Sequence, residues 1–204
     1  MTEEEWLTGA DPHPMLVFLR GKASDRKLRL FAVACSRRIW GLIDDLGRGA
    51  VEAAENFTDG HLGPDELRAA RLACQGAGGQ ASWYAAATNP EIAARNAARS
   101  AQAGVASHPL LGTEAAELLA QADLLRDIFG DPLRPLSFDQ SWRTSGVVQL
   151  AQMIYNDRAF DRMPELADAL AETGCDNDEI LSHCRGPGPH VRGCWVVDMM
   201  LGKE

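Results

Sequence analysis

Four prolines in this chain stand where a helix would begin, and this pattern limits the fold more than any other feature. They are Pro12 after Asp11, Pro64 before Asp65-Glu66, Pro90 after Asn89, and Pro164. Proline fixes its own φ near the helical value, and the N–H group that it lacks would be unpaired in a first helical turn anyway. Each of these prolines therefore predicts the start of a helix.

Apolar residues elsewhere recur at three- and four-residue spacing, the period of an amphipathic helix. The clearest example begins at Ser24 or Asp25 and continues to about Ile43. Its apolar stripe consists of Leu28, Phe31, Ala32, Cys35, Ile39 and Leu42. A helix that starts at Thr113-Glu114 has a predicted buried face of Leu118, Leu119, Ala122, Leu125, Ile128 and Phe129.

The remaining segments also read as helices. Thr2 and Glu5 have the spacing of a capping box, which predicts a short helix before Asp11. Further helices are predicted over 45–57, from 64 towards the glycines at 76–79, and over 91–106, 145–156, 164–172, 176–184 and 190–201. Gly76, Gly78 and Gly79 predict a helix break or a close helix crossing.

No segment shows the apolar–polar alternation of a strand, and alanine outnumbers the β-branched residues. The predicted fold class is all-α, an irregular multi-helix bundle of about eight to ten helices with no significant sheet. At 204 residues the chain is long enough for a substantial core. Pro132, Pro135 and the polar residues at 131–143 place a boundary between an N-terminal helical bundle, 1–130, and a C-terminal helical segment packed on it, 131–204; one single domain is the alternative.

The charge of the chain restricts its partners. A formal net charge of −9 argues against nonspecific binding of nucleic acid, which depends on a basic surface. One basic run stands out: Arg20, Lys22, Arg26, Lys27, Arg29, Arg37 and Arg38, with Asp25 as its one acid. We interpret it as the solvated face of a helix, with a docking patch for an acidic partner as the alternative.

The N-terminus, Thr2-Glu3-Glu4-Glu5, does not resemble a signal peptide, and no apolar run approaches the roughly 20 residues of a membrane span. The five cysteines are an odd number, and two of them lie in helical patterns. This favours reduced thiols in a cytoplasmic protein over a disulfide framework.

Potential metal ligands are concentrated near the C-terminus. Cys175, Cys184, His190 and Cys194 would complete a tetrahedral zinc site, with His183 as an alternative ligand. If His190 begins the last helix, His190 and Cys194 lie four residues apart on one helix face. The spacing Cys-x8-Cys-x5-His-x3-Cys is wider than that of a zinc knuckle, and the alternative is that these cysteines simply pack in the core.

Catalytic residues are not identifiable from the sequence. Cys184 or Cys194 with His183 or His190 would give a nucleophile and a base, but no oxyanion donor or third orienting group can be assigned. No cofactor is expected, and zinc is the one candidate that the sequence offers.

Three stretches of the chain resemble a family of uncharacterised proteins abundant in planctomycete bacteria. They are Leu-Arg-Leu-Phe-Ala-Val-Ala-Cys-Ser-Arg-Arg-Ile-Trp at 28–40, Leu-Leu-Arg-Asp-Ile-Phe-Gly-Asp-Pro-Leu-Arg-Pro at 124–135, and His-Cys-Arg-Gly-Pro-Gly-Pro-His-Val-Arg-Gly-Cys-Trp-Val-Val-Asp at 183–198. The resemblance extends over nearly the whole chain, from Trp6 to Lys203. It implies a bacterial cytoplasmic protein or module. It does not imply any particular activity.

Two functions of different classes follow. The leading hypothesis is a non-enzymatic helical module that acts through contacts with a protein partner, since the sequence combines a helical core pattern with no catalytic constellation. The alternative is a small zinc-binding protein or metalloenzyme that uses the C-terminal Cys/His cluster. A nucleic-acid-associated protein that uses the face from Arg20 to Arg38 ranks third; no nucleic acid or membrane partner is expected.

Overall fold

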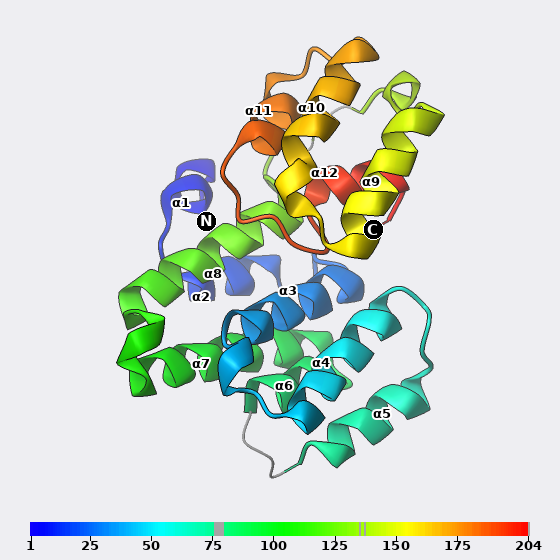
Figure 1. Cartoon of the computed structure of the whole chain (residues 1–204). Helices are drawn as coiled ribbons and strands as arrows, with labels where there is room; N and C mark the ends of the chain where they lie inside the picture. The colour runs from blue at the N-terminus through cyan, green and yellow to red at the C-terminus, as the bar shows by residue number, and fades with distance from the viewer. Residues whose placement is uncertain (76–79, 135, 137, 204) are drawn as a thin grey trace. The chain divides into compact units, whose positions relative to one another are not determined.

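The computed structural model describes residues 1–75, 80–134, 136 and 138–203 (Figure 1). Within these ranges the chain forms helices and no strand, which confirms the predicted all-α fold. None of these helices has both the length and the apolar composition needed to cross a lipid bilayer. The break predicted at Gly76, Gly78 and Gly79 lies outside the described residues.

Ten of the twelve α-helices in the described residues have seven residues or more, in agreement with the predicted number. In chain order they are α1 (Glu3–Thr8), α2 (Pro12–Leu19), α3 (Asp25–Arg38), α4 (Asp45–Thr58), α5 (Pro64–Ala73), α6 (Gln80–Ala85), α7 (Pro90–Ser107), α8 (Glu114–Phe129), α9 (Ser145–Asp157), α10 (Met163–Glu172), α11 (Asp178–Arg185) and α12 (Trp195–Leu201). Short 3-10 helices supplement them, among them η1 (Trp40–Leu42).

Three predicted helix starts are confirmed by their capping contacts. The Thr2 hydroxyl accepts a hydrogen bond from the Glu5 N–H, and the Glu5 carboxylate accepts one from the Thr2 N–H. The side chains of Asp11 and Asn89, immediately before the prolines that begin α2 and α7, accept hydrogen bonds from the N–H groups of His13 and Ile92. These bonds join residues at most three positions apart, so the sequence specifies them locally.

The chain divides into two compact units, Met1–Leu125 and Arg126–Glu204. The division falls inside α8, a few residues before the predicted boundary after residue 130. The first unit contains α1 to α7 and most of α8, and the second contains the end of α8 with α9 to α12.

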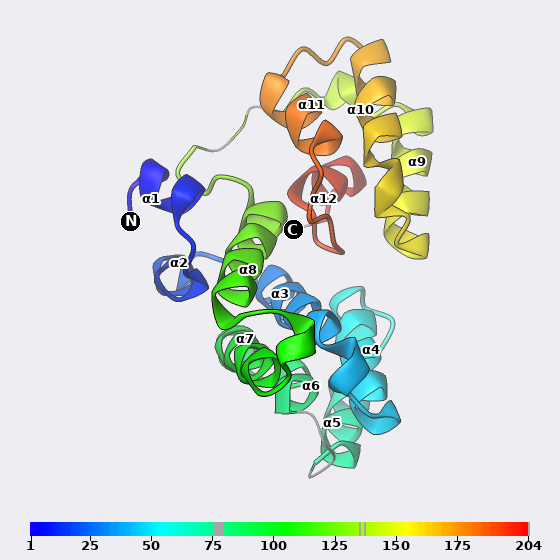
Figure 2. The same ribbon diagram turned by 60° about the vertical axis from the view of Figure 1, so that its left-hand side comes forward.

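Helix α3 is the centre of the first unit, where it packs against α4, α6 and α7 (Figures 1 and 2). Its residues 28–36 are all buried. A helix with neighbours on several sides cannot keep a broad polar face in water. The prediction of a solvated basic face is therefore wrong for Arg29, which is buried. The prediction that this helix extends to Ile43 is also wrong, because α3 ends at Arg38 and the narrower η1 follows.

The arginines of α3 reach partners inside the first unit. Arg29 is 3% exposed and donates hydrogen bonds to the carbonyl oxygens of Ala85, Ala87 and Thr88. Burial lowers the pKa of its guanidinium, and the charge of Asp25 acts in the opposite direction. Arg29 therefore joins α3 to the end of α6 and the residues that follow it.

The buried face of α8 also differs from the prediction. Leu119 is 47% exposed, whereas Glu117, Gln121 and Asp127 are buried. In the first unit, Arg38 of α3 donates to Glu117 at 2.8 Å, and the Gln121 amide donates to Glu117 at 2.8 Å. Because Arg38 of α3 and a hydrogen bond within α8 satisfy these polar groups, α8 can turn a polar stripe inward that apolar periodicity does not reveal.

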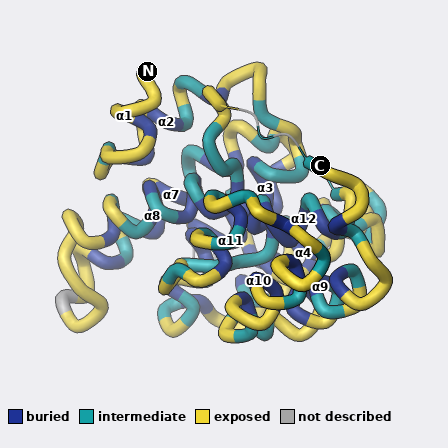
Figure 3. The backbone as a smooth tube through the Cα atoms, turned by 90° about the horizontal axis from the view of Figure 1, so that it is seen from above, coloured by how far each residue is buried: buried dark blue, intermediate teal, exposed yellow. Residues whose placement is uncertain are grey.

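The second unit has its own hydrophobic core, to which α9, α10, α11 and α12 contribute. Buried residues recur at three- or four-residue spacing along α9 and α10, as expected for helices with one face on a core (Figure 3). Large side chains fill this core, including Trp142, Ile154, Tyr155 and Leu166. Cys175, Cys184 and Cys194 belong to the same buried cluster.

Candidate metal centre

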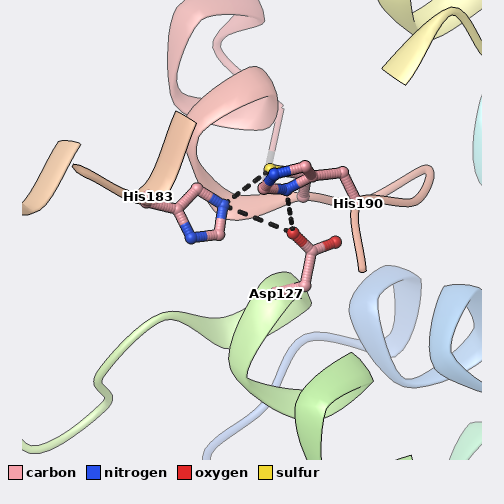
Figure 4. Close-up of side chains that lie close together, drawn as sticks. Asp127, His183 and His190 are labelled. Atoms are coloured by element: carbon pink, nitrogen blue, oxygen red, sulfur yellow. Dashed lines mark hydrogen bonds and ion pairs between the residues drawn. The ribbon is translucent and has the colours of Figure 1, made fainter. Parts of the chain in front are cut away.

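Four potential metal ligands converge in the second unit: Asp127, His183, His190 and Cys194. One nitrogen, oxygen or sulfur atom from each lies within 4.8 Å of the corresponding atom of every other. Figure 4 shows both imidazole rings directed towards the Asp127 carboxylate. Within the described residues, no second group of three or more potential ligands converges in this way.

Asp127 lies in the last turn of α8, two residues before the helix ends at Phe129. Gly130 follows with a φ of +63°, a conformation that glycine adopts without strain. A Cβ atom at Gly130 would lie 3.2 Å from the Trp195 side chain. Glycine at this position therefore lets the end of α8 approach the residue next to Cys194.

His183 lies in the last turn of α11. Asn177 caps the start of this helix by accepting hydrogen bonds from the N–H groups of Glu179 and Ile180. The His183 ring lies 5.1 Å from the Trp195 ring and 4.8 Å from the His190 ring, measured between centroids. Contact with these two rings restricts the orientation of the imidazole.

The other two ligands belong to the segment 186–194 between α11 and α12. Gly188 has a φ of +85°, and a Cβ atom there would lie 2.8 Å from the His190 backbone nitrogen. Only glycine fits this turn without displacing His190. Cys194 is the residue immediately before α12.

One oxygen of Asp127 is at the centre of the arrangement. Its Oδ1 atom lies 2.9 Å from His190 Nδ1 and 3.3 Å from His183 Nε2. His183 Nε2 also lies 3.2 Å from Cys194 Sγ. The second carboxylate oxygen, Oδ2, accepts a hydrogen bond from the Val191 N–H at 2.9 Å, which fixes the carboxylate with Oδ1 towards the imidazoles.

The centre is largely shielded from water. Asp127 is 2% exposed and Cys194 is 0% exposed, while the side chains of His190 and His183 are 7% and 20% exposed. Such burial disfavours an isolated charge, so these groups need each other or a cation.

Burial and charge shift the pKa values of the site residues. Burial alone would lower the pKa of His190, but the hydrogen bond and negative charge of Asp127, with the Gly186 carbonyl, raise it above its ordinary value. Burial, assisted by Asp127, raises the pKa of the Cys194 thiol well above its usual range, while the N–H groups of Val197 and Val196 act in the opposite direction. A metal cation would reverse this balance at Cys194 by favouring the thiolate.

Of the predicted ligands, the structure brings His190, Cys194 and the alternative ligand His183 together. Cys175 and Cys184 are not members of the group and lie in the hydrophobic core. Successive residues of an α-helix point about 100° apart, so the helix that turns His183 towards the site turns Cys184 elsewhere. Burial, with Asp127 and Cys175, raises the pKa of Cys184 to about 12, as expected for a thiol in an apolar core.

The prediction that His190 begins the last helix is wrong, because α12 begins at Trp195. Residues 191–194 form a turn in which the Cys194 N–H donates to the Val191 carbonyl, and Gly193 has a φ of +95°. A positive φ cannot continue a right-handed helix. His190 and Cys194 therefore meet through a turn and not through one helix face.

Asp127 is the site residue that the sequence analysis missed. The signal was an acidic residue in the same stripe as Leu124 and Ile128, both of which are buried. A carboxylate in a buried stripe needs a partner, which is a reason to look for one elsewhere in the chain.

No protein-family model, curated protein or solved structure matches this chain. The resemblance to the planctomycete family therefore remains a prediction from the sequence. The function has to follow from the geometry and chemistry of the site.

Proposed function

We propose that this protein binds one zinc ion through Asp127 Oδ1, His183 Nε2, His190 Nδ1 and Cys194 Sγ. The observation that carries the proposal is the convergence of these four donors within 4.8 Å of one another. Bonds of about 2.0–2.3 Å to zinc place tetrahedral ligands about 3.3–3.8 Å apart. The distances of 2.9, 3.2 and 3.3 Å between members of the group are close to these values, so small side-chain movements would complete the coordination.

The charges of the four ligands suit a divalent cation. A carboxylate and a thiolate carry two negative charges, and two neutral imidazoles add none. With zinc the buried centre is electrically neutral, which removes most of the penalty of burying its charged groups. Nitrogen and thiolate donors together favour zinc over magnesium or calcium, which prefer oxygen ligands.

Neighbouring groups hold two ligands in the orientation that metal binding requires. His190 Nε2 lies 3.4 Å from the Gly186 carbonyl, so the ring can donate its N–H there and keep Nδ1 as a lone-pair donor. The Val191 N–H holds Asp127 Oδ2. Contacts of this kind, from a ligand to a backbone group behind it, are typical of zinc sites.

Four protein ligands fill a tetrahedral zinc ion and leave no position for water or substrate. The proposed ion is therefore structural, and this argues against the metalloenzyme alternative. Ligation by Cys194 requires a reduced thiol, and all five cysteines are free. We accordingly place the protein in a reducing compartment such as the cytoplasm.

The test is the zinc content of the untagged full-length protein, measured by elemental analysis after purification without chelators. We expect about one zinc per chain. Asp127→Asn, His183→Ala, His190→Ala and Cys194→Ser should each reduce the content, and replacing zinc with cobalt should give a thiolate charge-transfer absorption that Cys194→Ser removes.

Two control variants test whether zinc binding is specific to these four residues. His61→Ala replaces an exposed histidine of the first unit and should retain the metal. Cys184→Ser distinguishes the observed group from the ligand set that the sequence predicted, and it too should retain the metal. Absence of zinc from the wild type, or zinc content in all four ligand variants equal to that of the wild type, contradicts the proposal.

A further inference from the structure

The segment 186–194 supplies two of the four ligands and has no helical structure of its own. Its backbone makes turns at Gly188 and Gly193, both with positive φ. Its hydrogen bonds to more distant parts of the second unit include the Val191 N–H to Asp127 and the Arg192 guanidinium to the carbonyls of Tyr155 and Asn156, at 3.1 and 3.2 Å. Cys194 anchors one end of the segment in the hydrophobic core, and polar contacts, several of them at the proposed zinc site, attach the rest.

The hydrophobic core of the second unit does not depend on this segment alone. Val147, Ile154, Met163, Leu166 and Leu170 are buried in it and belong to α9 and α10, which carry no zinc ligand. A classical zinc finger has too little core to fold without its metal. A unit with a core of this kind can lose a metal and keep most of its helices, so the loss is expressed as local opening.

We infer that zinc occupancy acts as a local conformational switch: bound zinc fixes the segment 186–194 to the ends of α8 and α11, and loss of zinc releases it while the helical cores persist. The inference rests on the zinc site proposed above and adds how that site is regulated. Zinc joins three separate parts of the chain, since Asp127 lies in the last turn of α8, His183 lies in the last turn of α11, and His190 and Cys194 lie in the segment itself.

Release of the segment has a defined consequence at the end of α9. Arg192 would leave the carbonyls of Tyr155 and Asn156, and its guanidinium also lies over the Tyr155 ring, 5.0 Å from the centroid. The C-terminal carbonyls of a helix carry partial negative charge and are stabilised by a nearby cation. The last turn of α9 is therefore expected to loosen together with the segment.

Hydrogen exchange of the full-length protein, followed by mass spectrometry, tests the switch. Each sample is divided so that its zinc content is measured alongside exchange, with zinc and after a chelator. We expect removal of zinc to accelerate exchange in 186–194 on the order of tenfold or more, with a smaller increase near residues 155–158 and no change in α3, α7 or α10.

Variants sharpen the result. His190→Ala and Cys194→Ser should exchange rapidly in 186–194 whether or not zinc is added, and His61→Ala should respond to zinc as the wild type does. Zinc bound without slower exchange in 186–194 overturns the switch and leaves the zinc site intact. Faster exchange throughout α9 and α10 also overturns it, because the loss would then be global. A protein that binds no zinc overturns both the site and the switch.

Discussion

An alanine-rich cluster of the first unit, formed by residues between α3 and α7, differs in its side chains from the core of the second unit. In this alanine-rich cluster nine of thirteen buried residues are alanine, and two of the other four are valine. Outside it the first unit also buries large side chains, among them Trp6 and Phe31. In the cluster of the second unit, two of sixteen are alanine, and the rest include Trp142, Tyr155, Met163 and three cysteines. The same helical fold class is thus stabilised by two kinds of packing.

Each kind of packing has its own physical requirement. Alanine buries little apolar area per residue, so the helices around the alanine-rich cluster gain contact by approaching closely, and buried polar groups such as Arg29 join the backbone between them. Large side chains in the second unit bury more area each and hold the helix ends around the centre formed by Asp127, His183, His190 and Cys194. The alanine-rich cluster should therefore be sensitive to added volume and the core of the second unit to lost volume.

The largest expected effect is the loss of volume in the second unit. Leu166 of α10 is 0% exposed and belongs to its core. Leu166→Ala should lower the free energy of unfolding by about 2–5 kcal/mol, because it removes buried apolar area and leaves a cavity. Chemical denaturation followed by circular dichroism measures this change. A loss below about 1 kcal/mol would mean that large-side-chain packing is not what stabilises this unit.

Added volume in the alanine-rich cluster of the first unit should have a somewhat smaller effect. Ala97 of α7 is 0% exposed among other alanines. Ala97→Leu should cost about 1–3 kcal/mol of unfolding free energy, because closely packed helices must move apart. Ala103 on the same helix is exposed, and Ala103→Leu should change stability by no more than about 0.5 kcal/mol. Equal effects of the two variants would contradict close packing at Ala97.

The smallest expected effect concerns the turn that carries His190. Gly188→Ala places a Cβ at a φ of +85° against the His190 backbone nitrogen and should cost about 1–2 kcal/mol locally. We expect weaker zinc binding with an unchanged helical signal, measured by competition with a chromogenic chelator. Gly146→Ala, in α9 with open space around its Cβ, should stabilise the protein by about 0.5–1 kcal/mol and leave zinc affinity unaltered. Wild-type affinity in Gly188→Ala would show that the turn does not position the ligand.

Sequence alone was sufficient wherever the decisive contacts are local. The capping bonds of Thr2, Asp11 and Asn89 join residues within three positions of one another, and the helices that they start were predicted at their observed positions. The candidate ligands His183, His190 and Cys194 were also recognisable, because they are close together in the chain and chemically suited to zinc.

Tertiary structure decided which helix faces meet. Asp127 reaches His190 across 63 positions of sequence, and Arg29 reaches the Ala87 carbonyl across 58. Apolar periodicity identifies the face of a helix that is buried but not the partner that it meets, so a buried acid or arginine looks like a surface residue until its partner is placed. For the same reason Cys175 and Cys184 resembled ligands in the sequence, whereas the direction of each side chain on the folded helices placed them in the core.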